Sequence, residues 1–295
     1  MHKEQLQLKG TRHLQMALGI TIAFFFIELA GGIFTQSLAL LADSWHMLSD
    51  ASALTFALIA AWIARKPIDL RKTFGYYRVE ILAAFLNGIF LWAVVIFIFY
   101  EAILRIQNPD VVVKSLDMFI IALAGLVANG ISMIILSKSK EESLNIKGAF
   151  LHVLTDTLGS VAAISAGLIM IFTGWYQADS LASILLGALI FYSSSKLVRE
   201  SMNVLLEGVP RGIDVNAVER KIMEFEGVKE VHDLHVWCMT PTKICAMSCH
   251  CVIEANVDRK KFISDLIKAL KEEFGIDHTT VQIEEEGYPK AVSEH

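Results

Sequence analysis

The sequence predicts an all-α transmembrane domain of six helices followed by a smaller C-terminal cytoplasmic α+β domain. The chain of 295 residues is 54% hydrophobic and only 19% charged, which is too apolar for an ordinary soluble domain. The apolar residues are also unevenly distributed, because long stretches without lysine or arginine give way, after residue 205, to a segment dense in Lys and Glu. We therefore assign residues 1–205 to the membrane domain and 206–295 to the cytoplasmic domain.

The lengths of the uncharged stretches predict the individual helices. A transmembrane helix needs about 20 apolar residues. The first and last stretches are long enough for two helices each, with breaks at 31–37 and 173–180, and the other two hold one helix each. The stretches that lack lysine and arginine are 13–64, 79–104, 115–137 and 148–195. Six spans place both termini on the same side of the membrane.

The distribution of basic residues predicts which side that is. The loop 65–78 contains five basic residues, and the N-terminal segment, the loop between the fourth and fifth helices and the start of the tail are basic too. The loops at 31–37 and 173–180 contain none. Because basic loops stay in the cytoplasm, both termini and the second domain should be cytoplasmic. The polar N-terminal segment has no small-residue cleavage site and is not expected to be a signal peptide.

The second predicted helix contains ionisable residues at membrane depth. Asp43, His46 and Asp50 are spaced three and four apart, so they share one helix face. The fifth helix repeats the spacing with His152 and Asp156. Since the two helices run in opposite directions, His46 should lie level with Asp156, and Asp50 with His152. Ionisable residues inside a bilayer are costly and usually functional.

Two imidazoles and two carboxylates that converge form a four-ligand site suited to a divalent transition metal, above all Zn²⁺. A single buried His–Asp pair has a structural hydrogen bond as an equally good explanation, but two such pairs on antiparallel spans favour a metal site. Asp43 is either a residue of the ion path or a solvated helix end. Glu28 is expected to contact a neighbouring helix, with a proton path as the alternative.

Several stretches resemble the cation diffusion facilitator family of metal/proton antiporters. They are "SLALLADSWHMLSD" (37–50), "FGYYRVEILAAFLNG" (74–88), "HVLTDTLGSVAA" (152–163) and "GVKEVHDLHVW" (227–237). The resemblance implies a homodimer in a lipid bilayer, a ferredoxin-like, metallochaperone-like cytoplasmic domain, and export of divalent cations in exchange for protons. It also implies that His46, Asp50, His152 and Asp156 bind the transported ion, and that two His with two Asp prefer Zn²⁺.

The cytoplasmic tail reads as helix, strand, strand, helix and strand, an αββαβ pattern typical of a two-layer domain. The expected elements are 214–225, 229–238, 243–254, 258–274 and 278–285. In this domain the resemblance implies a second, regulatory Zn²⁺ site, for which the candidate ligands are His232, His250, His278 and Glu284.

The four cysteines of the tail have a simpler interpretation. A cytosolic domain is not expected to contain a disulfide. Alternation along the strand places Cys249 and Cys251 on the face opposite His250. We therefore expect Cys238, Cys245, Cys249 and Cys251 to be buried free thiols, with a thiolate zinc site as the minority interpretation.

The resemblance also implies an ion pair between Arg78, at the cytoplasmic start of the third helix, and Glu207, just after the sixth. The alternative is that both residues are solvated, since surface ion pairs contribute only about 0–1 kcal/mol.

Other functions remain open on the sequence alone. The exported ion could be Cd²⁺, Co²⁺, Ni²⁺, Fe²⁺ or Mn²⁺, and a membrane metal sensor without ion flux is a further alternative. An intramembrane metallohydrolase would need an open metal position and a motif such as His-Glu-x-x-His, which the sequence lacks. An enzyme is therefore not expected. The net charge of −5 gives no indication of nucleic-acid binding, and the short loops favour a bacterial plasma membrane.

Overall fold

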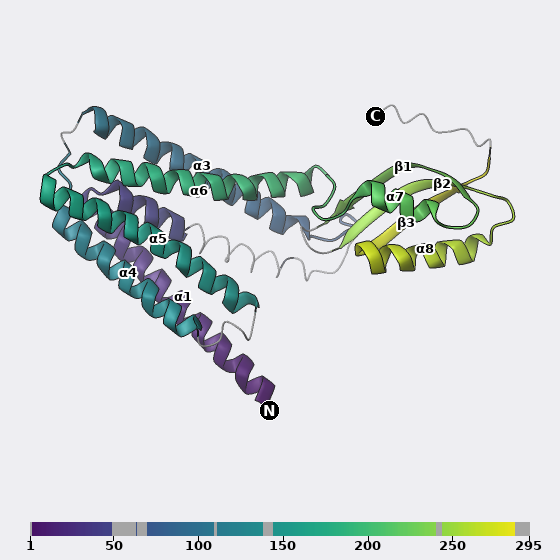
Figure 1. The fold of residues 1–295 in the computed structure, drawn as a ribbon, viewed down its shortest axis with the longest axis horizontal. Helices are drawn as coiled ribbons and strands as arrows, with labels where there is room; N and C mark the ends of the chain where they lie inside the picture. Colours follow the sequence, from purple (N-terminus) through teal and green to yellow (C-terminus); the bar gives the residue numbers. More distant parts are fainter. Residues whose placement is uncertain are drawn as a thin grey trace. The chain divides into compact units, whose positions relative to one another are not determined.

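The computed structural model describes residues 2–48, 63, 70–108, 111–137, 144–239 and 244–286 (Figure 1). Within these ranges the side chains of 2–15, 17–18, 144–152 and 155 are not described. The described residues fall into two compact units, one with residues up to 48 and 87–195, the other with residue 63, 70–86 and 196–286. Helices α3 and α6 each begin in one unit and end in the other.

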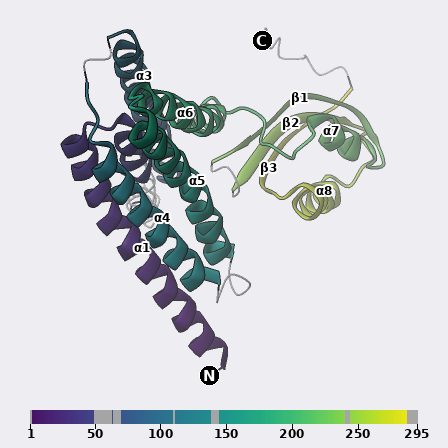
Figure 2. The ribbon, with the colours of Figure 1, turned by 60° about the vertical axis from the view of Figure 1, so that its left-hand side comes forward.

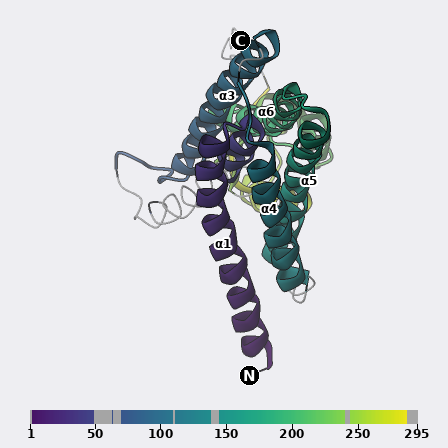
Figure 3. The same cartoon turned by 90° about the vertical axis from the view of Figure 1, so that its left-hand side faces the viewer.

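The first unit is helical. Its helices are α1 (His2–Thr35), α3 (Arg78–Gln107), α4 (Ser115–Ser137), α5 (Leu144–Thr173) and α6 (Gln177–Leu205). Residues 38–48 are also helical. Figures 1 and 3 show α1, α4 and α5 side by side, in agreement with the contacts between these helices. Small residues such as Ala39, Ala122 and Ala163 are fully buried where the helices meet, which lets the helices pack closely.

The helices have the length and composition of membrane spans. Among the described residues, four are long and apolar enough to cross a bilayer, namely α3, α4, the part of α5 from Asp156 to Thr173, and α6. Gly19–Thr35 is a shorter apolar helix, and 38–48 begins the second predicted span. The predicted class, a helical transmembrane domain, is confirmed, whereas the count of six extends to residues beyond those described.

The C-terminal domain confirms the predicted order of elements. It consists of α7 (Val215–Met223), β1 (Val228–Cys238), β2 (Cys245–Ile253), α8 (Arg259–Phe274) and β3 (Ile276–Glu284). Helix ends follow local signals, because Asp258 caps α8 through the backbone N–H groups of Lys260 and Lys261, and Gly275 ends it in the left-handed conformation.

The three strands form one sheet in the order β1-β2-β3, with β1 and β2 antiparallel and β2 and β3 parallel (Figure 2). The core lies between one face of this sheet and the two helices, where Val218 of α7 and Leu266 of α8 pack with Cys249 and Cys251 of β2. The other face of the sheet is free of these helices and presents His232 and His250.

Candidate metal centres

The membrane centre begins with a tight turn between α1 and the helical segment 38–48. Gln36 adopts the left-handed conformation, with φ at 58°. Ser37 then caps the new helix, since its hydroxyl accepts a hydrogen bond from the N–H of Leu40 at 3.2 Å. The turn fixes the direction in which segment 38–48 returns along the bundle, and so the position of His46 two turns further on.

Asp179, the third residue of α6, holds the same turn. Its buried carboxylate accepts hydrogen bonds from the Ser37 hydroxyl at 2.6 Å, from the N–H of Leu38 at 2.7 Å and from the N–H of Ala39 at 3.2 Å. A carboxylate that accepts hydrogen bonds from the first N–H groups of a helix is also stabilised by the positive end of the helix dipole. Asp179 was missed by the sequence analysis, because nothing in the sequence pairs it with a turn some 140 positions earlier.

His46 and Asp156 come together as the antiparallel arrangement predicts. The Nε2 atom of His46 lies 3.8 Å from Oδ1 of Asp156. Asp156 is only 4% exposed and His46 is 26% exposed, so a carboxylate and an imidazole meet inside an apolar bundle. Asp50 lies outside the described residues. His152 is described only as part of α5, one turn before Asp156.

Two more carboxylates are buried near this pair. Asp43 is 6% exposed and is therefore buried rather than solvated, and its Oδ1 would lie 2.7 Å from a Cβ placed on Gly159. Glu28 of α1 is 2% exposed, and its Oε1 would lie 2.6 Å from a Cβ on Gly125. The charged neighbours of Glu28 are Asp43 and Asp156. Both acids thus occupy space left by glycines on facing helices.

The cytoplasmic centre depends on an irregularity in β1. Its register with β2 pairs His232 with His250 and then His235 with Ser248, so three steps along β1 match two steps along β2. Asp233 lies in this bulge with φ at 52°. A bulge re-aims the residues that follow it, and it brings His235 to the same face of the sheet as His232.

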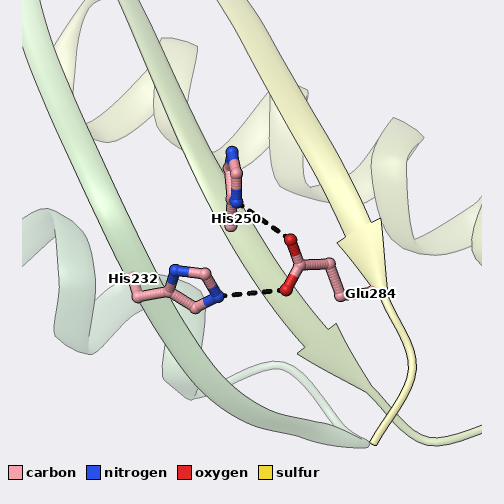
Figure 4. Close-up of side chains that lie close together, drawn as sticks. All are labelled: His232, His250 and Glu284. Carbon is pink, nitrogen blue, oxygen red and sulfur yellow. Dashed lines mark hydrogen bonds and ion pairs between the residues drawn. The ribbon is translucent and has the colours of Figure 1, made fainter. Parts of the chain in front are cut away.

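Three side chains from three strands converge on that face (Figure 4). The Oε2 atom of Glu284 lies 3.1 Å from Nε2 of His232, and its Oε1 lies 2.9 Å from Nδ1 of His250. The two imidazole rings are 5.1 Å apart between centroids. Glu284 is 2% exposed, whereas the two histidines are about one-fifth exposed, so a cation could reach the histidine side.

The carboxylate of Glu284 is held in its ionised form. Burial acts to raise its pKa, but the hydrogen bonds from Gln282 and His232 and the charges of His232 and His250 lower it, and the net pKa lies below the ordinary value of 4.5. Gln282 donates to Oε1 at 2.9 Å. The glutamine is therefore a partner of Glu284.

The donor set fits a divalent metal. The ligand atoms of His232, His250 and Glu284 all lie within 4.8 Å of one another, and nitrogen with carboxylate oxygen is a typical zinc set. The enclosed Nδ1 of His250 makes no hydrogen bond in the described structure although it lies 2.9 Å from Oε1 of Glu284. Nδ1 of His250 and Oε1 of Glu284 can both bind a metal. They lie close together without hydrogen-bond geometry, as two ligand atoms would around a shared cation.

The structure does not bring His278 into this group. His278 pairs with Ala246 in the parallel register and is exposed. It lies six residues before Glu284 on β3, which is roughly 20 Å along a strand.

Asp233, by contrast, was missed by the sequence analysis. Its carboxylate lies 3.0 Å from Nε2 of His235 and 3.8 Å from Nε2 of His250, a contact that strict alternation along β1 conceals.

The prediction that the domain has no disulfide is wrong for one pair. Cys238 and Cys245 are bonded, because the hairpin register places them directly opposite each other with Cα atoms 4.0 Å apart. Cys249 and Cys251 are free and buried as predicted. The hydrogen bond between the Cys249 and Cys251 thiols and burial both raise the pKa of Cys249, which disfavours Cys249 as a metal ligand because metals bind the thiolate.

Arg78 and Glu207 lie in contact, with Nη2 of the arginine 2.8 Å from Oε1 of the glutamate. The pair is partly solvated, at 37% and 58% exposed. Glu207 itself adopts the left-handed conformation just after α6, with φ at 57°.

Comparison with known proteins places these features in a family. The model of the cation efflux transmembrane domain matches residues 14–206, and that of the cation efflux protein cytoplasmic domain matches 210–286. The metal-bound C-terminal domain of the CzcD transporter from Cupriavidus metallidurans is 34% identical, with a TM-score of 0.23, and the match covers 24% of this chain and 99% of that one.

Curated relatives match over most of both chains. The metal cation efflux system protein CzcD of Cupriavidus metallidurans is 44% identical over 92% of this chain and 86% of its own length. The cadmium, cobalt and zinc/H(+)-K(+) antiporter of Bacillus subtilis is 42% identical over 90% and 86%. The zinc transporter ZitB of Escherichia coli is 42% identical over 93% and 88%. This chain therefore belongs to the cation diffusion facilitator family, and it is a multi-pass membrane transporter for divalent metal cations with a cytoplasmic C-terminal domain, not an enzyme.

Proposed function

We propose that the protein exports Zn²⁺ from the cytoplasm in exchange for protons. The observation that carries this proposal is the approach of His46 to Asp156, 3.8 Å apart across two antiparallel helical segments of an apolar bundle. With Asp50 and His152 these residues form a two-His, two-Asp ligand set, which favours Zn²⁺ among divalent metals. The names of the relatives ZitB and CzcD, and that of the Bacillus antiporter, agree with zinc as a substrate.

Exchange for protons follows from the ligand chemistry. An imidazole must be neutral to bind Zn²⁺, so protons and metal compete for the same nitrogen atoms. Histidine titrates near neutrality, and this allows each departing metal ion to be replaced by protons from the outer side. The buried carboxylates of Asp43 and Glu28 lie along the same bundle and extend the path for positive charge.

We further propose a homodimer in the bacterial plasma membrane, with a regulatory Zn²⁺ held by His232, His250 and Glu284. Nδ1 of His250 and Oε1 of Glu284, close together without a hydrogen bond, support the metal over a purely structural cluster. Arg78 and Glu207 act in this proposal as a charge pair that links the start of α3 to the segment after α6.

Flux in proteoliposomes tests the proposed function. The full-length chain is reconstituted with a zinc dye and a pH dye inside, and Zn²⁺, Cd²⁺, Co²⁺, Ni²⁺, Fe²⁺ and Mn²⁺ are compared. Zinc-dependent proton movement opposite to the metal supports antiport. Metal binding without any flux would instead assign the protein to the sensors.

A substitution at His46 tests the assignment of zinc preference. His46→Asp replaces a nitrogen donor by a harder oxygen and adds negative charge, so the ratio of Cd²⁺ to Zn²⁺ flux should rise. An unchanged ratio would remove His46 from the residues that set selectivity.

A further inference from the structure

A cavity of about 540 Å³ lies beside the first turns of α3. It is formed by the loop that precedes α3, by the end of α6 and by the end of β1, all within the second compact unit. Its size falls in the range of small-molecule sites, about 300–1,000 Å³. The lining residues that matter for its chemistry are Lys72, Phe74, Tyr76, Tyr77, Arg78 and Trp237.

The lining combines aromatic rings with basic side chains. Tyrosine and tryptophan prefer the interface between membrane and water, where one end of the ring is apolar and the other is wet. Lys72 and Arg78 supply positive charge. Among the described residues that line the cavity, Glu207 is the single acid, and it already accepts a hydrogen bond from Nη2 of Arg78.

Arg78 has one N–H donor without an acceptor among the residues that the structure describes. A guanidinium has five N–H donors in a fixed fork. The Nε atom of Arg78 is enclosed and makes no hydrogen bond with the residues that the structure describes. An enclosed N–H without an acceptor costs free energy, so the site favours a ligand with oxygen acceptors and negative charge.

The ends of two candidate membrane spans line this cavity, which places it where we expect the lipid headgroups. Arg78 is the first residue of α3, and Leu205 is the last of α6, and both helices are long and apolar enough to span a membrane. The ends that meet here are the cytoplasmic ones, because the cytoplasmic domain follows α6 directly. Basic residues next to the cytoplasmic ends of spans attract anionic lipids of the inner leaflet.

We propose that this cavity binds the headgroup of an anionic phospholipid from the cytoplasmic leaflet. The phosphate accepts a hydrogen bond from the Nε–H of Arg78 and pairs with the ammonium group of Lys72. The glycerol carbons lie against Phe74 and Trp237. One guanidinium then holds Glu207 through Nη2 and the phosphate through Nε, so the bound lipid braces the same arginine that contacts the segment after α6.

Native mass spectrometry of the full-length protein in detergent tests this site with phosphatidylglycerol and phosphatidylcholine. The wild-type chain should retain phosphatidylglycerol in preference to phosphatidylcholine. Lys72→Gln and Arg78→Lys should each weaken the phosphatidylglycerol adduct about fivefold. Arg78→Lys keeps a positive charge for Glu207 but removes the Nε–H, so a weaker adduct in this variant assigns the phosphate to that donor.

Lys196→Gln is the matched control, because it removes one exposed basic residue of α6 that does not line the cavity. It should bind phosphatidylglycerol like the wild type. Equal affinities in the wild type, Lys72→Gln and Arg78→Lys would overturn the proposal. If inorganic phosphate displaces the phosphatidylglycerol adduct, the cavity is a site for soluble phosphate. If Phe74→Cys cross-links two chains without lipid, a second copy of the chain covers the cavity. Either result rejects the lipid.

Discussion

The membrane centre and the cytoplasmic centre use the same donors, imidazole nitrogen and carboxylate oxygen, but they differ in charge balance. Near His46 the structure buries three carboxylates, those of Glu28, Asp43 and Asp156. The sequence stretches 13–64 and 148–195 supply no lysine or arginine to oppose them. On the sheet, the carboxylate of Glu284 is met by two histidines and the amide of Gln282, and the carboxylate of Asp233 lies 3.0 Å from His235 and 3.8 Å from His250.

This difference agrees with the proposed roles of the two centres, a transport site in the membrane and a regulatory site on the sheet. Buried carboxylates in excess, in a low-dielectric bundle, are stable only with added positive charge. The membrane centre therefore needs a metal ion or protons at each stage, as an antiporter requires. In the cytoplasmic centre the histidines and Gln282 already balance the carboxylate of Glu284, so under the proposed function a metal there would bind and leave according to its concentration.

Removal of one membrane carboxylate is the strongest test of this contrast. Asp156→Asn keeps the size of the side chain but removes a negative charge that balances the positive charge of the metal. Zinc flux in proteoliposomes should therefore fall roughly a hundredfold or more. Asp117→Asn, at the exposed start of α4, is the matched control and should transport normally. Flux that survives in Asp156→Asn would place the ion site elsewhere.

The scaffold of the membrane centre should be nearly as sensitive as its ligands. Asp179→Ala leaves the Ser37 hydroxyl and the N–H groups of Leu38 and Ala39 without their acceptor, and each unsatisfied donor costs about 1–3 kcal/mol. We expect the maximal flux to fall about tenfold with little change in the metal concentration for half-maximal flux. Asp179→Asn retains one acceptor oxygen and should recover part of the rate. If Asn and Ala are equally impaired, the charge of Asp179 matters rather than its hydrogen bonds.

The Arg78–Glu207 pair tests whether the start of α3 and the segment after α6 are coupled by charge. Arg78→Glu places two carboxylates where a cation now meets an anion at 2.8 Å, and flux should fall severalfold. Adding Glu207→Arg should restore part of it. A partly exposed pair is worth only about 0–1 kcal/mol in stability, so thermal unfolding should change little. A double variant no better than the single would show that the two residues are not coupled.

The stability of the cytoplasmic centre should respond to pH. The folded protein holds the pKa of Glu284 below 4.5, so the ionised carboxylate stabilises the fold above about pH 4.5, and this contribution is lost as the pH falls through the folded-state pKa. Thermal unfolding of the metal-free chain should separate wild type from Glu284→Gln near neutrality, and the difference should shrink below pH 4.5. A constant difference would assign Glu284 a role independent of its charge.

Much of the architecture could be predicted from local patterns. The uncharged stretches and their lengths predict the apolar helices, and the αββαβ order follows from periodicity. The pairing of His46 with Asp156 follows from helical spacing and antiparallel direction alone. These features depend on short-range regularities, which a sequence displays directly.

The features that the sequence analysis missed depend on how the strands align with one another. The bulge at Asp233 moves His235 to the face of His232. The residues before it give no sign of this extra residue in β1. Aspartate does tolerate the left-handed conformation better than most residues. Cys238 and Cys245 bond because the hairpin aligns them, which an argument from cellular compartment alone overlooks. His278 was included through family resemblance, but the parallel register of β3 places it far along the strand from Glu284.

The glycine at position 125 has a consequence for how this family can vary. Its missing side chain is the space in which the Glu28 carboxylate sits, with Oε1 only 2.6 Å from where a Cβ would be. We therefore expect positions 28 and 125 to vary together, since even alanine at 125 would displace the carboxylate of Glu28. Relatives that carry a larger residue at 125 should have a shorter or neutral residue at 28, and neither change should persist without the other.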